Sequence, residues 1–141
     1  MKRTMILAKA LIYNSDGLVL LLKRHSMSKT RPGQWDFAGG KIDGGEDIAA
    51  GAIREIFEES GIKFGFSDLR LAWTESEIDG ELTICHITFI ANVPNADIRL
   101  SEEHSEYTWV TLDEAISMYG YPPHNRVLKL ARDKQMIPNW C

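Results

Sequence analysis

The chain has only two cysteines, Cys85 and Cys141, and they lie far apart in the sequence. Neither belongs to a Cys-x-x-Cys pair, so the sequence predicts no disulfide framework and no zinc site. It also lacks an apolar run of about 18 residues, the length that a membrane-spanning helix needs. Residues 5–12 follow a basic start, but Lys9 interrupts them and no small-residue cleavage site comes after, which argues against a signal peptide. We therefore expect a cytoplasmic protein without a membrane partner.

Basic residues are in the minority. The 16 Lys and Arg stand against 20 Asp and Glu, which gives a net charge of -4. Nucleic-acid backbones require clustered basic side chains, so we expect no nucleic-acid partner. An acidic protein that binds phosphates must supply positive charge locally, and a bound metal ion is the obvious source. The length of 141 residues fits one domain, 1–141, with a core of its own.

Turn signals and hydrophobic periodicity divide the chain into elements. Strands are expected at 4–13, 18–23, 69–78, 81–92 and 107–110. The Asp79-Gly80 turn makes 69–92 a β-hairpin. Helices are expected at 47–60, from the capping box at 111–114 to about 118, and at 125–134. Polar residues 25–34 predict a loop, and the glycines at 39–45 predict an irregular segment. Without regular βαβ alternation, this pattern favours an α+β or α/β sandwich with a mixed sheet.

The expected helix 47–60 carries Glu55, Glu58 and Glu59, whose spacings of three and four residues place them on one face, opposite the apolar face. Like charges at this spacing repel by about 0.2–0.5 kcal/mol per pair, near a helix end that disfavours negative charge. A divalent cation would reverse this cost. Oxygen-only ligands suit Mg²⁺, with Mn²⁺ as the alternative. Taken alone, the cluster is more typical of a solvated acidic helix face.

The surrounding sequence decides between these interpretations. Residues 40–62 read GKIDGGEDIAAGAIREIFEESGI and match the Nudix box, G-x5-E-x7-R-E-U-x-E-E-x-G-U with U apolar, at every fixed position. The chain therefore resembles the Nudix hydrolase superfamily. The resemblance implies an α/β/α sandwich with a mixed sheet between helices. It also implies divalent-metal-dependent cleavage of a phosphoanhydride bond in a nucleotide substrate.

Site residues follow from the resemblance position by position. It implies metal ligands at the Gly39 carbonyl and at three carboxylates, Glu55, Glu58 and Glu59. Glu46 would support the loop through Arg54, and Gly40 and Gly61 would be structural. The general base would be Glu58 or Glu55, with Glu103 as an alternative.

A further metal ligand is expected from the downstream acidic segment 101–109. Glu103 is the first choice there, ahead of Glu102 and Glu106, and an exposed acidic loop is the alternative.

The resemblance is nearer to the MutT type, which cleans oxidised nucleoside triphosphates. The stretch WDFAGGKID at 35–43 resembles W-E-F-P-G-G-K-I-E, although Ala38 and Asp36 depart from it; His86-Ile87-Thr88 and the PPHN at 122–125 add to the likeness. Asn125 would then read the base, or else cap the last helix. Lys23 and Arg24 would reach the phosphates, or else be a solvated strand end.

This resemblance implies hydrolysis of a nucleoside triphosphate, with 8-oxo-dGTP as a candidate, to the monophosphate and pyrophosphate. An ADP-ribose or nucleotide-sugar pyrophosphatase is the alternative enzyme, and a non-catalytic nucleotide-binding module is the alternative from another class. The protein would be a monomer or a homodimer. His25, His104 and His124 are expected in loops, as ligand contacts or as ordinary surface histidines.

Overall fold

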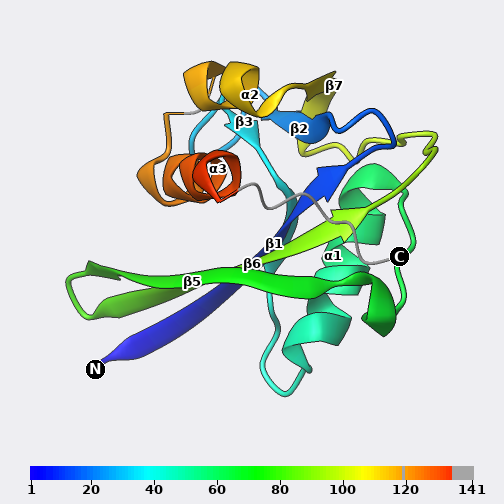
Figure 1. Cartoon of the computed structure of the whole chain (residues 1–141). Helices are drawn as coiled ribbons and strands as arrows, with labels where there is room; N and C mark the ends of the chain where they lie inside the picture. Colours follow the sequence, from blue (N-terminus) through cyan, green and yellow to red (C-terminus); the bar gives the residue numbers. More distant parts are fainter. Residues whose placement is uncertain (119, 135–141) are drawn as a thin grey trace.

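A seven-stranded mixed sheet separates helix α1 from helices α2 and α3 in the computed structural model, which describes residues 1–118 and 120–134 (Figure 1). The helices are α1 (Ile48–Ser60), α2 (Leu112–Met118) and α3 (Pro122–Asp133), with a 3-10 turn at Phe66–Asp68. The strands are β1 (Arg3–Tyr13), β2 (Val19–Arg24), β3 (Trp35–Asp36), β4 (Ala38–Lys41), β5 (Arg70–Asp79), β6 (Leu82–Asn92) and β7 (His104–Val110). The expected α+β fold and its α/β/α layering are confirmed.

The sheet divides beside β1. Its main path runs β3-β2-β1-β6-β5, and β1 pairs in parallel with β6 along its whole length. On its other side β1 pairs with β4 over residues 7–10, but with β2 only where Tyr13 faces Val19. The first half of β1 and the β5–β6 hairpin therefore extend beyond α3, as Figure 1 shows.

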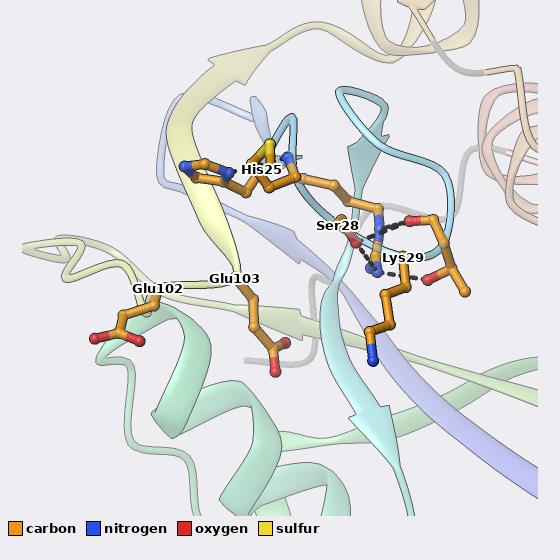
Figure 2. Close-up of a pocket in the computed structure, with 8 residues that line it drawn as sticks. His25, Ser28, Lys29, Glu102 and Glu103 are labelled. Atoms are coloured by element: carbon orange, nitrogen blue, oxygen red, sulfur yellow. Dashed lines mark hydrogen bonds between the residues drawn. The ribbon is translucent and has the colours of Figure 1, made fainter.

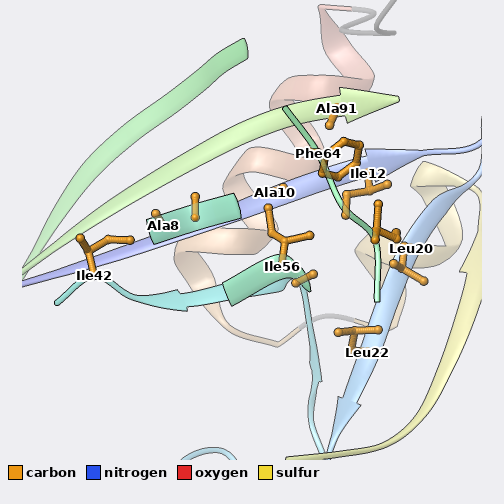
Figure 3. Packing of buried hydrophobic residues seen from close by; sticks show 12 residues of the cluster. Ala8, Ala10, Ile12, Leu20, Leu22, Ile42, Ile56, Phe64 and Ala91 are labelled. Atoms are coloured by element: carbon orange, nitrogen blue, oxygen red, sulfur yellow. The ribbon is translucent and has the colours of Figure 1, made fainter. Parts of the chain in front are cut away.

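Two apolar cores hold the helices to the sheet. On one face, Ile56 and Ala52 of α1 pack in a cluster with Ala8 and Ala10 of β1 (Figure 3). On the other, Leu11 of β1 lies in a cluster with α3 residues that recur at helical spacing. Because successive strand residues point to opposite faces, β1 supplies both cores. Of the three glutamates of α1, Glu55 is half-buried, Glu58 is exposed and Glu59 is buried.

The expected elements hold, but strand β3 was not expected, and there are four further differences. The hairpin turn consists of Gly80 and Glu81, one residue later than expected, because Asp79 already pairs with Leu82. Strand β7 begins at His104, three residues early. The other two differences, at β4 and α3, change the site.

The glycine segment expected to be irregular contains strand β4. Gly39 pairs with Lys9 and has a φ of 133°, and a Cβ at this position would lie 2.3 Å from the Ala8 carbonyl oxygen. Glycine is disfavoured in strands on average, which is why the sequence pattern did not predict one here. At Gly39 the missing side chain is what permits the close approach to β1.

Helix α3 begins at Pro122, not at Asn125. The two prolines occupy its first positions, where a missing N–H is tolerated. Asn125 is thus inside the helix and does not cap it; its Nδ2 donates to the Ile116 carbonyl at 3.1 Å.

Two of the three histidines expected in loops are buried in regular elements: His124 in α3 and His104 in β7. Only His25 lies in an exposed loop.

Cys85 is half-buried in β6 and not fully buried as a strand hydrophobe would be, and Cys141 lies outside the described residues. Among the helices that the structure describes, none has the length and apolar character to cross a membrane.

Candidate active site

The box residues surround the start and the polar face of α1. Asp47 caps the helix by accepting a hydrogen bond from the Ala50 N–H at 3.0 Å. The helix ends at Gly61, whose φ of 78° is the left-handed conformation of a C-cap glycine. These two ends fix the thirteen-residue length of α1 and the direction of its carboxylates.

Arg54 joins three glutamates. Its Nε and Nη2 donate to the two oxygens of Glu46 at 2.7 and 2.9 Å. Its Nη1 donates to Glu55 at 2.9 Å and to Glu58 at 3.3 Å. Glu46 also accepts from the Asp43 N–H at 3.1 Å, so the same carboxylate ties the preceding loop to the helix. The hydrogen bond from Arg54 is the main reason that the pKa of Glu46 is lowered to about 2.

Gly51 was not singled out from the sequence, although a glycine inside a helix is a signal of close packing. A Cβ at Gly51 would lie 2.7 Å from Oε1 of Glu46 and 2.7 Å from Cδ1 of Ile42. The absent side chain therefore leaves the space in which Glu46 meets Arg54.

Glu59 is buried, with 4% of its surface exposed. Its Oε1 accepts from the Gly39 N–H at 2.8 Å. Burial raises the pKa of Glu59 to about 8, against the opposing effects of the Lys9 charge and the Gly39 hydrogen bond. Burial thus disfavours the ionised form of Glu59, and the positive charge of Lys9 does not fully offset this effect.

Glu55 lies against Gly40. A Cβ at Gly40 would be 2.6 Å from Oε2 of Glu55, so the glycine gives the carboxylate room to approach β4. Burial raises the pKa of Glu55, and the negative charges of Glu58 and Glu103 add to that increase. Glu103, just before β7, is therefore electrostatically part of the same acidic group.

A buried cluster of opposite charges lies beside this group, and the sequence analysis missed it. Asp36 is fully buried, and its Oδ2 accepts from Lys9 at 2.9 Å, Arg24 at 3.0 Å and Arg31 at 3.4 Å. Burial alone would raise the pKa of Asp36, but the nearby charges, chiefly that of Lys9, hold it well below its usual range. The sequence feature that could have revealed this cluster is Lys9, a charged residue within an apolar stretch of the expected strand.

A cavity of about 500 Å³ opens between these groups. Apolar side chains of β1 and β6 contribute to it, as do carboxylates and cations. The lining residues are Met5, Leu7, Lys9, Arg24, Thr30, Arg31, Gly39, Gly40, Lys41, Glu55, Glu59, Leu82, Ile84, Glu103 and Tyr121.

The structure separates the residues expected to bind substrate. Arg24 lines the cavity. Lys23 instead lies 5.8 Å from the centre of the Trp35 ring, and Asn125 is held at Ile116, so neither lines the cavity. From the segment around Asn125 the cavity receives Tyr121, whose ring centre is 4.2 Å from Cζ of Arg31. The role of Asn125 in reading the base stays a prediction.

The donors present fit a hard divalent cation. They are carboxylate and carbonyl oxygens, and two of the carboxylates, Glu55 and Glu59, have raised pKa values. Over residues 1–118 and 120–134, however, no three acidic, histidine or cysteine side chains converge closely enough to enclose a metal. Mg²⁺ commonly uses one or two carboxylates and completes its shell with substrate phosphates, so an incomplete protein shell suits it.

The fold and the carboxylate helix define the class of protein. The NUDIX domain family matches residues 4–131, and the chain belongs to this family. The resemblance and the class of enzyme expected from the sequence, a Nudix hydrolase, are confirmed.

Individual relatives agree with this assignment. The chain is 30% identical over 115 residues to the nucleoside triphosphatase NudI of Escherichia coli, covering 74% of this chain and 81% of that protein. NudI of Salmonella arizonae is 32% identical over 113 residues, covering 73% and 79%. Among solved structures, the MutT protein of Methanosarcina mazei Go1 is similar with a TM-score of 0.83 and 33% identity, covering 95% of this chain and 96% of that one.

Proposed function

We propose that the protein hydrolyses a nucleoside triphosphate to the monophosphate and pyrophosphate, with Mg²⁺ as its cofactor. The observation that carries this proposal is the composition of the 500 Å³ cavity. Met5, Leu7 and Ile84 offer apolar surface for a nucleoside, and Glu55, Glu59 and Glu103 offer a metal-binding wall for the phosphates. One cavity thus has surfaces suited to both parts of the substrate.

The relatives support the same substrate class. The two NudI proteins are named nucleoside triphosphatases. The names do not identify the base, so 8-oxo-dGTP stays a prediction. The cytoplasmic location and the monomeric or homodimeric state also stay predictions.

The metal would be held by carboxylates of α1 and by its neighbours. We assign this role to the Gly39 carbonyl, Glu55, Glu58, Glu59 and Glu103. When bound, the ion neutralises the polyphosphate and stabilises the charge that develops on the leaving oxygen.

The protein's own residues would position the reactants. A carboxylate accepts a proton from the attacking water as its oxygen bonds to phosphorus and the bridging P–O bond breaks. Of the two box glutamates favoured for this role, Glu55 lines the cavity and Glu58 does not. We therefore place the base at Glu55, with Arg54 fixing its orientation through the 2.9 Å hydrogen bond. Tyr121 and Arg31, which contact each other, would border the nucleobase of the substrate.

A substrate panel with Mg²⁺ tests the function. Release of pyrophosphate from dGTP or 8-oxo-dGTP is expected, whereas AMP from ADP-ribose alone would favour the alternative enzyme. Stoichiometric nucleotide binding without turnover in any metal would favour a binding module.

Conservative variants test the assignment of Glu55 as the general base. Glu55→Gln should lower kcat by about 10²–10⁴-fold, the usual contribution of a general base. Glu58→Gln should also abolish most turnover if Glu58 is a metal ligand, but with an increased requirement for metal. Glu81→Gln, in the exposed turn between β5 and β6, is the matched control. An active Glu55→Gln enzyme would remove Glu55 from the mechanism.

A further inference from the structure

A second cavity, of about 360 Å³, adjoins the first. Arg24, Thr30 and Glu103 line both, so the two cavities meet beside the acidic wall. The remaining residues of this second cavity come mostly from the loop between β2 and β3, and are His25, Met27, Ser28, Lys29 and Glu102 (Figure 2). Neither the box nor the proposed mechanism gives these residues a role.

Arg24 holds this loop in shape. Its Nε donates to the Thr30 carbonyl at 2.7 Å, and its Nη2 donates to the hydroxyls of Ser28 at 2.9 Å and Thr30 at 2.8 Å. Both residues that flank Lys29 are therefore bound to the same guanidinium. The His25 N–H donates to the Glu103 carbonyl at 2.9 Å, which ties the loop to β7 as well.

Lys29 itself has no such partner. In the described part of the chain its side chain takes part in no hydrogen bond and no ion pair, although Glu103 lines the same cavity. In Figure 2 the Lys29 and Glu103 side chains project in the same direction. A fixed backbone that presents an unpaired ammonium group beside a proposed metal-binding carboxylate is suited to an anion that also binds the metal.

Of the other cations that line the two cavities, Lys9, Arg24 and Arg31 are already engaged, whereas Lys41 of β4 has no partner among the described residues. Lys9, Arg24 and Arg31 all donate to Asp36. Asp36 thus partly neutralises their positive charge, whereas no carboxylate pairs with Lys29 in the described part of the chain. His25 lines the same cavity, but its Nδ1 accepts from the Met27 N–H at 3.1 Å and its ring points away from the ends of the Lys29 and Glu103 side chains (Figure 2).

We propose that Lys29 binds the terminal phosphate of the substrate. The nucleoside would occupy the first cavity, the scissile bond would lie at the acidic wall, and the leaving pyrophosphate would extend into the second cavity. Lys29 is then a specificity-determining residue that favours triphosphates over diphosphates. This inference rests on the proposed function, since it assigns one end of the proposed substrate.

Kinetics with two substrates of the same base test it. Lys29→Gln should raise KM for the nucleoside triphosphate by about tenfold, the effect of losing one charge-assisted hydrogen bond of about 1.4 kcal/mol. It should change kcat little, and KM for the diphosphate, which lacks the terminal phosphate, much less. Lys29→Arg should restore most of the preference. Lys129→Gln, with the same charge change on the exposed side of α3, is the matched control. An equal increase in KM for both substrates, or no increase for either, would overturn the assignment.

A binding measurement separates this inference from the proposed function. Calorimetric titration of inorganic tripolyphosphate with Mg²⁺ present needs no turnover. Weaker binding to Lys29→Gln than to the Lys129→Gln control is expected even if no nucleotide is hydrolysed. Unchanged tripolyphosphate binding in an enzyme that does cleave triphosphates would reject the subsite and leave the hydrolase intact.

Discussion

Lys9 and Asp36 form an ion pair in which Nζ lies 2.9 Å from Oδ2 while the two residues are 5% and 0% exposed. The pair joins β1 to β3, and Lys9 also donates to the Gly39 carbonyl at 3.3 Å. The same lysine therefore anchors strand β4, whose glycines lie against the acidic wall. Since Asp36 also binds Arg24 and Arg31, the two partners are not equivalent.

This asymmetry makes a prediction about stability. Asp36→Asn leaves three cations around a neutral group and should lower the free energy of unfolding by about 3–5 kcal/mol. Lys9→Met leaves Asp36 with two guanidinium partners and should cost less, about 1–3 kcal/mol. Urea unfolding of both variants measures the difference. A larger loss in Lys9→Met than in Asp36→Asn would contradict the central position of Asp36.

Gly51→Ala should separate stability from activity. Alanine is favoured over glycine in a helix by about 1 kcal/mol, and the atoms its Cβ would meet are the ends of flexible side chains. The helix should therefore hold, but Glu46 must move away from Arg54, and kcat should fall. Gly44→Ala is the control because a Cβ there meets nothing within 4 Å. Full activity in Gly51→Ala would show that the position of Glu46 does not matter.

Arg54→Lys should disable the site without unfolding the protein. A lysine ammonium cannot make the separate contacts to Glu46, Glu55 and Glu58 that the guanidinium makes. We expect kcat/KM to fall about 10–100-fold, as is usual when a group that orients metal ligands is replaced. Arg126→Lys, which alters the Glu75 ion pair outside the site, is the comparison. Similar kinetics in the two variants would argue against a positioning role for Arg54.

The lowered pKa of His124 predicts that the protein loses stability in mild acid. Burial lowers the pKa of this histidine to about 3 from an ordinary value of 6.5. Between these two values the unfolded chain binds a proton that the native protein does not, so the stability present above pH 6.5 declines as the pH falls. The slope from this one group is about 1.4 kcal/mol per pH unit. The groups that influence its charge are Asp36 of β3, Lys9 of β1, Arg31 of the β2–β3 loop and His86 of β6.

His124→Phe isolates this effect, since a phenyl ring can keep the stacking on Phe37, whose ring centre is 4.8 Å away. Unfolding free energies at pH 7.5, 6 and 5 should decline less in the variant than in the wild type. Parallel pH profiles would mean that His124 is protonated in the native protein.

Removal of divalent cations should stop turnover but leave the fold. Helix α1 is held by its Asp47 cap and by the packing of Ile56, neither of which needs a metal. EDTA should therefore abolish hydrolysis with little change in circular dichroism, and Mg²⁺ should restore it. Mg²⁺ at a hundred times its dissociation constant should add about 2.7 kcal/mol to the stability of the protein. Unfolding by EDTA would instead mean that the metal is structural.

The local sequence determined much of this protein. Apolar residues at helical spacing, the Asp47 cap and Gly61 define α1 within one residue, because each acts over a few neighbouring positions. The spacing of Glu55, Glu58 and Glu59 placed them on one face for the same reason. The box thereby gave the family and the class of enzyme.

Only the tertiary structure decided how distant segments meet. The buried contact between Lys9 and Asp36, the pairing of Gly39 with β1, and Lys29 held beside Glu103 each join residues far apart in the chain. Periodicity and turn signals carry no information about such pairs, because sheet register and packing are selected by the whole core. The acidic residues of the site could be predicted from the local sequence. The cavities beside them exist only in the folded protein.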